Sequence, residues 1–152
     1  MIPNKIYNAI PDAALVCTII LACFLDRFFP IVTIIPFPAS LIGWVAIVLG
    51  IGLAVYTLAA LKSKRTSTDA AAMPSELMTR GPYSFSRNPF YFSYVIIGMG
   101  VAFALGSLTA FVAPVICFAV IHLMIIPLEE RNLQKRFEQE YFKYKHSVRR
   151  WI

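Results

Sequence analysis

The chain has 152 residues, of which 59% are hydrophobic and only 14% are charged, and its formal net charge is +6. This apolar share exceeds that of soluble domains, so the composition excludes an ordinary soluble globule and predicts a polytopic membrane protein with a single domain, residues 1–152. Three cysteines lie in apolar runs without a CxxC pair, which predicts small buried side chains and neither a disulfide framework nor a metal site: Cys17, Cys23 and Cys117.

Four stretches have about the length and apolarity of a membrane-spanning helix. They are residues 13–29, 41–61, 89–105 and 108–128. No cleavable signal pattern is expected before the first. The run "FFPIVTIIPFPAS" contains three prolines and is expected to be a bent, partly buried connection. The last two stretches are separated only by Gly106–Ser107, so they should form an antiparallel hairpin within an all-α bundle.

Four spans would place both termini on the same side of the membrane. Thirteen of the fourteen basic residues then fall on that side, and only Arg27 falls on the other. The positive-inside rule predicts that the termini, the loop over residues 62–89 and the tail are cytoplasmic. The positive charge is explained by this topology and by anionic lipid, so binding to nucleic acid is not expected.

The tail over residues 129–148 is predicted to be an amphipathic helix, lying at the cytoplasmic interface or packed on the bundle. Its apolar and aromatic residues recur at steps of three and four: Leu133, Phe137, Tyr141, Tyr144 and Val148. Pro127 precedes the acidic pair Glu129–Glu130 and suits either a helix start or a kink.

The polar segment "RGPYSFSRNPFY", residues 80–91, interrupts the apolar sequence before the third span. One interpretation is structural: Gly-Pro forms a turn, the aromatic residues form an interfacial belt, and the arginines reach toward phosphates. Asn88 and Pro89 would then cap and begin the third helix. Taken alone, the segment is equally compatible with a functional role.

Three other features also leave two interpretations open. Glu129–Glu130 is typical of a solvated helix start, and Gly98 and Gly100 are typical of close helix contacts in membranes. His122 lies seven residues before Glu129, so the two would share a face of an unbroken α-helix. Because an ionisable group within a span is costly, His122 is a functional candidate, with a neutral histidine bonded to a carbonyl as the alternative.

In combination and order, these features resemble the isoprenylcysteine carboxyl methyltransferase and phospholipid methyltransferase superfamily. The resemblance covers residues 79–152, about half of the chain. It rests on "GPYxxSRNPxY", on a span with small residues, on a second span ending in the acidic pair, and on "F…Y..Y…VRRWI". This chain departs from the usual pattern in having Ser84 after "GPY", Ser93 after "RNPxY" and Glu138 in place of a glycine after Phe137.

The resemblance implies an enzyme that binds S-adenosyl-L-methionine, releases S-adenosyl-L-homocysteine and methylates a lipophilic acceptor from the bilayer, with no metal. It implies that Arg87 and Glu130 are catalytic, and that the cofactor site includes Tyr83, Asn88, Tyr91, Gly98, Gly100, His122, Glu129 and Glu130. A carboxylate acceptor could be oriented by Arg87 without a base. For a phospholipid amine, Arg87 would hold the phosphate, and His122 or a glutamate would take the proton.

We therefore expect an integral membrane methyltransferase with a cytoplasmic active site, most similar to isoprenylcysteine carboxyl methyltransferases. A phospholipid amine N-methyltransferase is the alternative. An NADPH-dependent sterol reductase shares the architecture, but the acidic pair and the tail favour methyl transfer. A non-enzymatic membrane scaffold is the remaining interpretation. The sequence leaves the acceptor and the oligomeric state open.

Overall fold

The computed structural model describes residues 4–63 and 76–152. The regular structure in these residues is helical, with one isolated bridge between Thr33 and Ser107, so the expected all-α fold is confirmed. The elements are α1 (Asn4–Phe28), α2 (Leu41–Ser63), η1 (Gly81–Ser84), α3 (Pro89–Leu105), η2 (Leu108–Phe111), α4 (Val112–Val120), η3 (Ile121–Ile125) and α5 (Ile126–Ser147).

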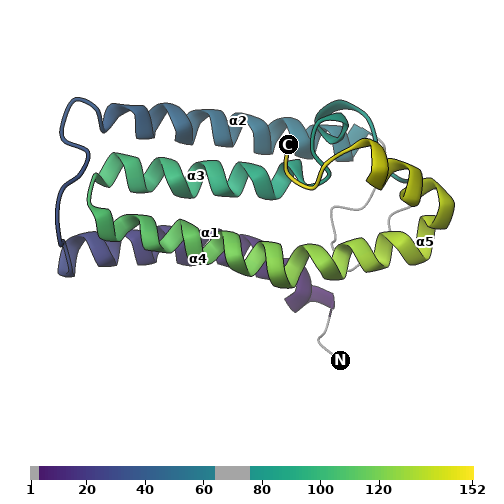
Figure 1. Cartoon of the computed structure of the whole chain (residues 1–152), viewed down its shortest axis with the longest axis horizontal. Helices are drawn as coiled ribbons and strands as arrows, with labels where there is room; N and C mark the ends of the chain where they lie inside the picture. The colour runs from purple at the N-terminus through teal and green to yellow at the C-terminus, as the bar shows by residue number, and fades with distance from the viewer. Residues whose placement is uncertain (1–3, 64–75) are drawn as a thin grey trace.

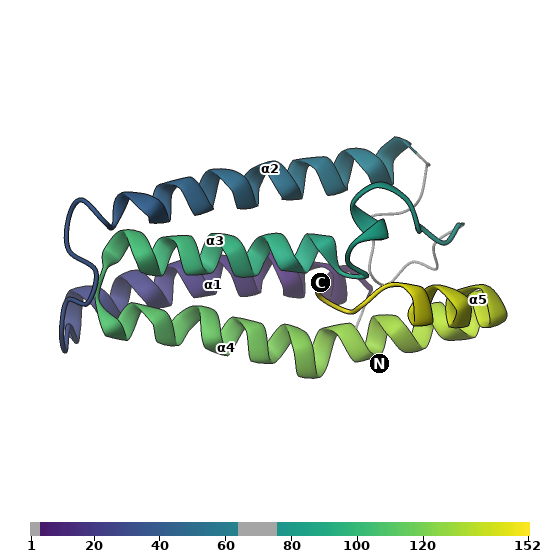
Figure 2. The ribbon, with the colours of Figure 1, turned by 45° about the horizontal axis from the view of Figure 1, so that its top comes forward.

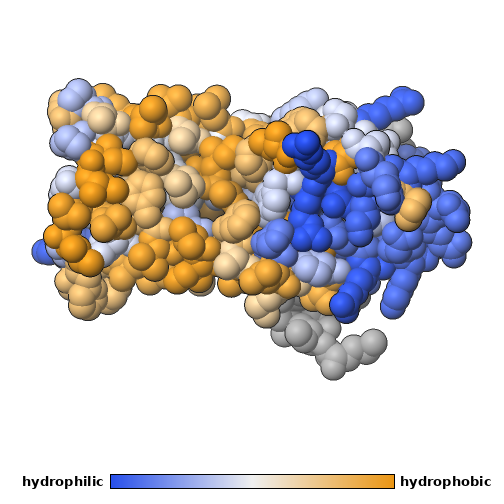
Figure 3. Space-filling view, in the orientation of Figure 1, coloured by the Kyte–Doolittle hydropathy of each residue, from blue (hydrophilic) through white to orange (hydrophobic). Residues whose placement is uncertain are grey.

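The helices α1 to α4 lie side by side, with α3 in the middle of the bundle (Figures 1 and 2). Where α3 meets α1, η2 and α4, the buried core is made of small residues that allow close approach of helices: Ala22, Ala102, Ala110 and Ala113. Most large aliphatic side chains of α2 stay exposed, and orange apolar residues cover much of the bundle in Figure 3. An apolar exterior of this extent is suited to lipid.

Among the described residues, two helices are long and apolar enough to cross a membrane: Leu41–Lys62 and the continuous helical run Thr109–Ser147. The helix α3 has the bounds expected from the sequence, but its 17 residues make it a shorter apolar helix. The helix α1 starts earlier than expected, at Asn4. Four spans therefore remain a prediction.

The proline-rich connection between α1 and α2 lies at the end of the bundle remote from α5. It is a connection as expected, but it is more exposed than expected, with Ile31 and Phe37 76% and 79% exposed. The backbone N–H groups of Ile34 and Ile35 donate to the carbonyl of Gly106. Gly106 has a φ of 81°, a conformation suited to glycine, and it closes the expected α3–η2 hairpin. The expectation that all three cysteines are buried holds only for Cys117, because Cys17 and Cys23 are exposed.

The fourth helix does not end before the acidic pair, so the tail is not the separate helix that the sequence predicted. Helix α4 passes through the π-helix η3 directly into α5. The backbone N–H of Ile126 donates to the carbonyl of Ile121, five residues earlier. Because Pro127 has no N–H to donate, a wide turn before it lets the helix continue without a complete set of α-helical bonds.

Helix α5 reverses direction at Glu138, which has a φ of 36° and a ψ of −104°. The first arm leads away from the bundle and the second arm returns, as Figures 1 and 2 show. The turn falls at the position where the sequence departs from the glycine of the superfamily. The second arm buries Tyr141 and Tyr144, so the tail is packed on the protein as a helical hairpin.

Candidate active site

The segment over residues 80–91 is a compact loop that ends in α3. Gly81 has a φ of 63° and opens η1, in which Pro82 is buried. Pro89 begins α3 as expected. Asn88 was expected to cap this helix, but its side chain makes no capping bond. Instead, its Nδ2 donates to the carbonyl of Arg150 at 3.0 Å, so the loop is bonded to the end of the chain.

Residues 148–152, here called the C-terminal strap, run from the end of α5 back along this loop (Figure 2). The backbone N–H of Arg87 donates to the carbonyl of Arg149 at 3.0 Å. The hydroxyl of Ser86 donates to the carbonyl of Arg150 at 3.3 Å. These bonds attach the strap to the polar motif at the start of α3.

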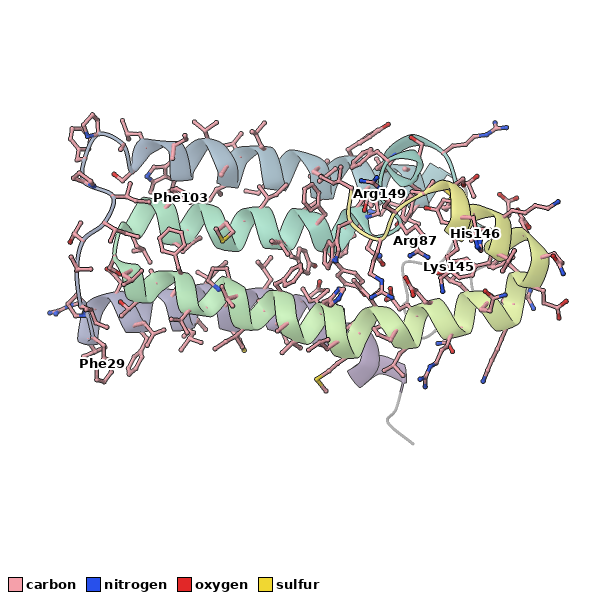
Figure 4. All side chains as sticks on the ribbon, in the orientation of Figure 1. Phe29, Arg87, Phe103, Lys145, His146 and Arg149 are labelled. Carbon is pink, nitrogen blue, oxygen red and sulfur yellow. The ribbon has the colours of Figure 1, made fainter. Side chains whose placement is uncertain are left out.

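Arg87, Glu130 and Arg150 form a cluster of charges in which Arg87 and Glu130 are buried and Arg150 is 30% exposed. Arg150 donates to both carboxylate oxygens of Glu130, from Nε to Oε1 at 3.1 Å and from Nη2 to Oε2 at 2.8 Å. Nη2 of Arg87 lies 3.3 Å from Oε1 of Glu130, and Nη1 of Arg87 donates to the hydroxyl of Tyr141 at 3.4 Å. The side chains of Arg87 and Glu130 are 9% and 11% exposed, and Nε of Arg87 is buried without a partner. Arg87 lies between the start of α3 and α5 in Figure 4.

Glu129 faces a different set of partners, the tyrosines. The hydroxyl of Tyr91 donates to its Oε1. Glu129 directly follows the predicted span over residues 108–128, and burial raises the pKa of its carboxyl to about 7 against the opposing effect of the Tyr91 hydrogen bond. Burial, and then the charge of Glu129, also raise the pKa of Tyr83, whose carbonyl accepts from the hydroxyl of Tyr144 at 2.7 Å.

His122 lies inside the π-helix and contacts the strap. Nε1 of Trp151 donates to its Nδ1 at 3.1 Å, and its ring stacks on Phe118 with centroids 5.5 Å apart. An indole N–H can only donate, so Nδ1 of His122 is the acceptor in this contact. The expectation that His122 shares a face with Glu129 rested on an unbroken α-helix, and that premise is wrong because the π-helix shifts the helical phase between them.

The two glycines of α3 lie against neighbouring helices. A Cβ added to Gly98 would meet Pro114 and Thr18 at 3.3 Å, and one added to Gly100 would meet the carbonyl oxygen of Gly43 at 2.8 Å. These contacts are those of close helix approach, the alternative that the sequence left open. A cofactor role for either glycine stays a prediction without a contact that supports it.

Several side chains in this region were not singled out from the sequence. The strap is connected to the loop by Ser86, to α5 by Arg150 and to η3 by Trp151. Asp12 accepts from the hydroxyl of Tyr94 and so ties α1 to α3. The motif "VRRWI" contributed to the superfamily resemblance, but the sequence did not assign a role to any of its residues. Within residues 4–63 and 76–152, no group of three or more His, Cys, Asp or Glu residues is placed to hold a metal ion.

Comparison with known proteins agrees with the motif and the acidic pair. The family described as phospholipid methyltransferase matches residues 39–140, most of the chain, including the loop and both glutamates. The chain belongs to the phospholipid methyltransferase family. This confirms the superfamily resemblance and makes the protein a membrane-associated methyltransferase. The C-terminal strap lies outside the matched residues.

A relative of this family member is an uncharacterised protein of Haemophilus influenzae. It is 36% identical over 62 residues, which cover 41% of this chain and 98% of that protein. No solved structure matches the chain.

Proposed function

We propose that the protein is an S-adenosyl-L-methionine-dependent methyltransferase that modifies a lipophilic acceptor at the cytoplasmic face of the membrane, with residues 1–152 acting as one domain. Family membership supplies the methyl transfer. The observation that carries the rest is Arg87, a guanidinium 9% exposed with an unpartnered Nε–H, at the polar end of an apolar bundle.

Arg87 suits an anionic group of the acceptor. A buried guanidinium that keeps an unused donor is costly unless a ligand satisfies it. Guanidinium binds phosphate or carboxylate with paired hydrogen bonds, which orient the ligand as well as attract it. The phosphate of a phospholipid or the carboxylate of a prenylated cysteine meets this requirement, and either would place its acyl or prenyl chain along the apolar helices.

The residues around Glu129 fit the cationic cofactor. S-Adenosylmethionine would supply a methyl group activated by a positively charged sulfur. Glu129, with the rings of Tyr83 and Tyr91 nearby, offers a carboxylate and aromatic faces that suit ribose hydroxyls or cations. Glu130 fits this role less well because Arg150 and Arg87 already use both of its oxygens. We therefore assign Glu129 to the cofactor, and Glu130 to the support of Arg87.

The two candidate acceptors differ in whether methyl transfer needs a base, a second role that Glu129 could fill beside binding the cofactor. A phospholipid amine must lose a proton when its nitrogen forms the new N–C bond, and a carboxylate with a pKa of about 7 can accept that proton. This and the family match favour a phospholipid amine. An isoprenylcysteine carboxylate needs no base, because its oxygen forms the new bond without carrying a proton. It is the second candidate, favoured by the fit of a carboxylate to Arg87.

The polar end of the molecule supports a site open to the cytoplasm. Blue hydrophilic residues gather at the end formed by α5 and the strap, while the bundle is largely orange (Figure 3). Basic side chains concentrate at this end, and the positive-inside rule associates them with the cytoplasm.

The test is incubation of the purified protein with labelled S-adenosylmethionine and total membrane lipid, followed by identification of the labelled product by mass spectrometry. Arg87→Ala should abolish labelling, a loss of at least about a hundredfold, because its ionic contact to the acceptor is lost. Arg136→Ala, which removes an exposed arginine of α5, is the matched control and should label normally.

The product also separates the acceptors, since a methylated headgroup amine and a carboxyl methyl ester differ in their stability to alkali. Folding of each variant is checked by its melting temperature in detergent. Full labelling by folded Arg87→Ala would contradict the proposed site. Stronger thermal protection by NADPH than by S-adenosylhomocysteine would favour a reductase, and protection by neither would favour a scaffold.

A further inference from the structure

The charge cluster at the start of α3 contains two guanidinium groups and one carboxylate. Arg150 uses both oxygens of Glu130, whereas Arg87 reaches only Oε1, at the longer distance of 3.3 Å. Because the carboxylate of Glu130 is buried, its charge interacts with both guanidinium groups more strongly than it would in water. Paired hydrogen bonds from one guanidinium also fix its geometry. Arg150 is therefore the principal partner of Glu130, and one positive charge remains in excess.

The backbone of the strap holds Arg150 in this position. Its carbonyl accepts from Nδ2 of Asn88 at 3.0 Å and from the hydroxyl of Ser86 at 3.3 Å. On either side of it, the carbonyl of Arg149 accepts from the backbone N–H of Arg87, and the indole of Trp151 donates to His122. The backbone on both sides of Arg150 is thus held in place, and the side chain of Arg150 reaches the carboxylate of Glu130, twenty residues earlier in the chain.

We propose that Arg150 is a positioning residue that saturates Glu130 and so keeps Arg87 available for the anionic group of the acceptor. This inference rests on the proposed function of Arg87. The excess positive charge and the unpartnered Nε of Arg87 are what a phosphate or a carboxylate would use. Without Arg150, both oxygens of Glu130 become available, and Arg87 would pair with them in place of the acceptor.

The direct test measures anion binding without methyl transfer. Two probes, dodecyl phosphate and laurate in a non-ionic detergent, are titrated by calorimetry into the full chain and into Arg150→Gln, Arg150→Lys and Lys145→Gln. Arg150→Gln should weaken binding of the probe about tenfold or more, since the charged hydrogen bonds of Arg87 would then go to Glu130 and not to the probe. Arg150→Lys should lie between, because an ammonium keeps the charge but lacks the two-pronged geometry. Lys145→Gln removes an exposed charge nearby and should bind as the original chain does.

A rescue experiment separates this role from simple support of the fold. In Glu130→Gln/Arg150→Gln, the competing carboxylate is gone, so Arg87 is released and affinity for the probe should recover by about tenfold over Arg150→Gln alone. Loss of a structural support would instead be worsened by the second change. Original affinity in both Arg150 variants, or no recovery in the double variant, overturns the proposal.

The fluorescence of Trp151 reports, in the same variants, whether the strap stays docked. The chain has two tryptophans, so Trp44→Phe, at an exposed position of α2, leaves Trp151 as the sole emitter. An emission spectrum unchanged by Arg150→Gln shows that the strap stays docked. A shift of the emission to the red would mean that the strap has undocked in Arg150→Gln. In that case, Arg150→Lys is compared with the original chain, and probe binding as tight as that of the original chain overturns the proposal.

The two probes also identify the anion, since tighter binding of dodecyl phosphate indicates a phospholipid and tighter binding of laurate a carboxylate acceptor. With the labelled acceptor, Arg150→Gln should raise the KM for the acceptor about tenfold while leaving the KM for S-adenosylmethionine unchanged. If the original chain methylates nothing, the proposed function fails, but the binding series still decides whether Arg150 controls Arg87.

Discussion

The adjacent glutamates have different partners, since Glu129 contacts a tyrosine and Glu130 contacts two arginines. The environment of Glu129 predicts how cofactor binding responds to pH. Burial raises the pKa of Glu129 to about 7. Its carboxyl is ionised above this value and protonated below it, so cofactor binding that uses the carboxylate should increase as pH rises through about 7. Titration with S-adenosylhomocysteine between about pH 5.5 and 8.5 should show this rise in the original chain.

Glu129→Gln should bind weakly at every pH in this range and lose the rise. The control is Glu140→Gln, an exposed acid of the second arm of α5, which should keep the original profile. The same pH dependence in Glu129→Gln would assign the titration to another group.

At the residue scale, the sequence singled out Arg87 as a candidate but not Arg150, which contacts the same glutamate. Arg87 stands out because it sits between a serine and Asn-Pro at the mouth of an apolar helix. Arg149 and Arg150 look alike in the sequence, as two of many basic residues on the expected cytoplasmic side. Helix α5 ends at Ser147, so no periodicity remains to say which arginine turns inward. Only the tertiary contact with Glu130 distinguishes Arg150.

At the element scale, the contact between α2 and α3 predicts opposite effects of two glycine substitutions. A Cβ on Gly100 would lie 2.8 Å from the backbone of Gly43, whereas one on Gly52 has nothing within 4 Å. Gly100→Ala should therefore destabilise the protein by about 1–3 kcal/mol, and Gly52→Ala should stabilise it by up to ~1 kcal/mol. Melting temperatures in detergent, measured without cofactor, check both. Unchanged stability of Gly100→Ala with weakened binding of S-adenosylhomocysteine would restore the predicted cofactor role.

The turn at Glu138 predicts a stabilising substitution in the tail. A residue with a Cβ is strained at a φ of 36°, whereas glycine adopts positive φ readily. Glu138→Gly should therefore raise stability by about 1 kcal/mol, measured as a higher melting temperature. Gln139→Gly, at the next and exposed helical position, should lower it by about 0.5–1 kcal/mol. A loss of stability in both variants would show that the turn gains nothing from glycine.

These elements also show why some boundaries were predictable. Helix α3 lies between Pro89 and Gly106, whose backbone preferences mark a start and a stop, and its predicted bounds agree with the structure. The tail has no such marker. A glutamate at positive φ gives no turn signal, and the π-helix before Pro127 arises from hydrogen bonding that residue periodicity does not encode. A straight amphipathic helix was therefore expected where a hairpin forms.

At the scale of the whole molecule, the apolar bundle has two ends of different chemistry. The polar end carries η1, α5 and the strap, and Arg87, Lys145, His146 and Arg149 lie there in Figure 4. Phe29 and Phe103 lie at the opposite end. The basic residues of the polar end favour the cytoplasm, so the site and the α1–α2 connection should face opposite sides of the membrane.

Single cysteines introduced at the two ends of a chain otherwise free of cysteine test this arrangement. Ser84, in η1, and Ile31, which is 76% exposed in the α1–α2 connection, are accessible positions. A membrane-impermeant maleimide applied to intact cells should label Ile31→Cys and spare Ser84→Cys, and inverted membrane vesicles should give the reverse. Helix α2 joins the two regions and is long and apolar enough to cross the bilayer. Labelling of both positions from the same side would mean that α2 does not cross, and labelling in the opposite sense would place the site outside the cytoplasm.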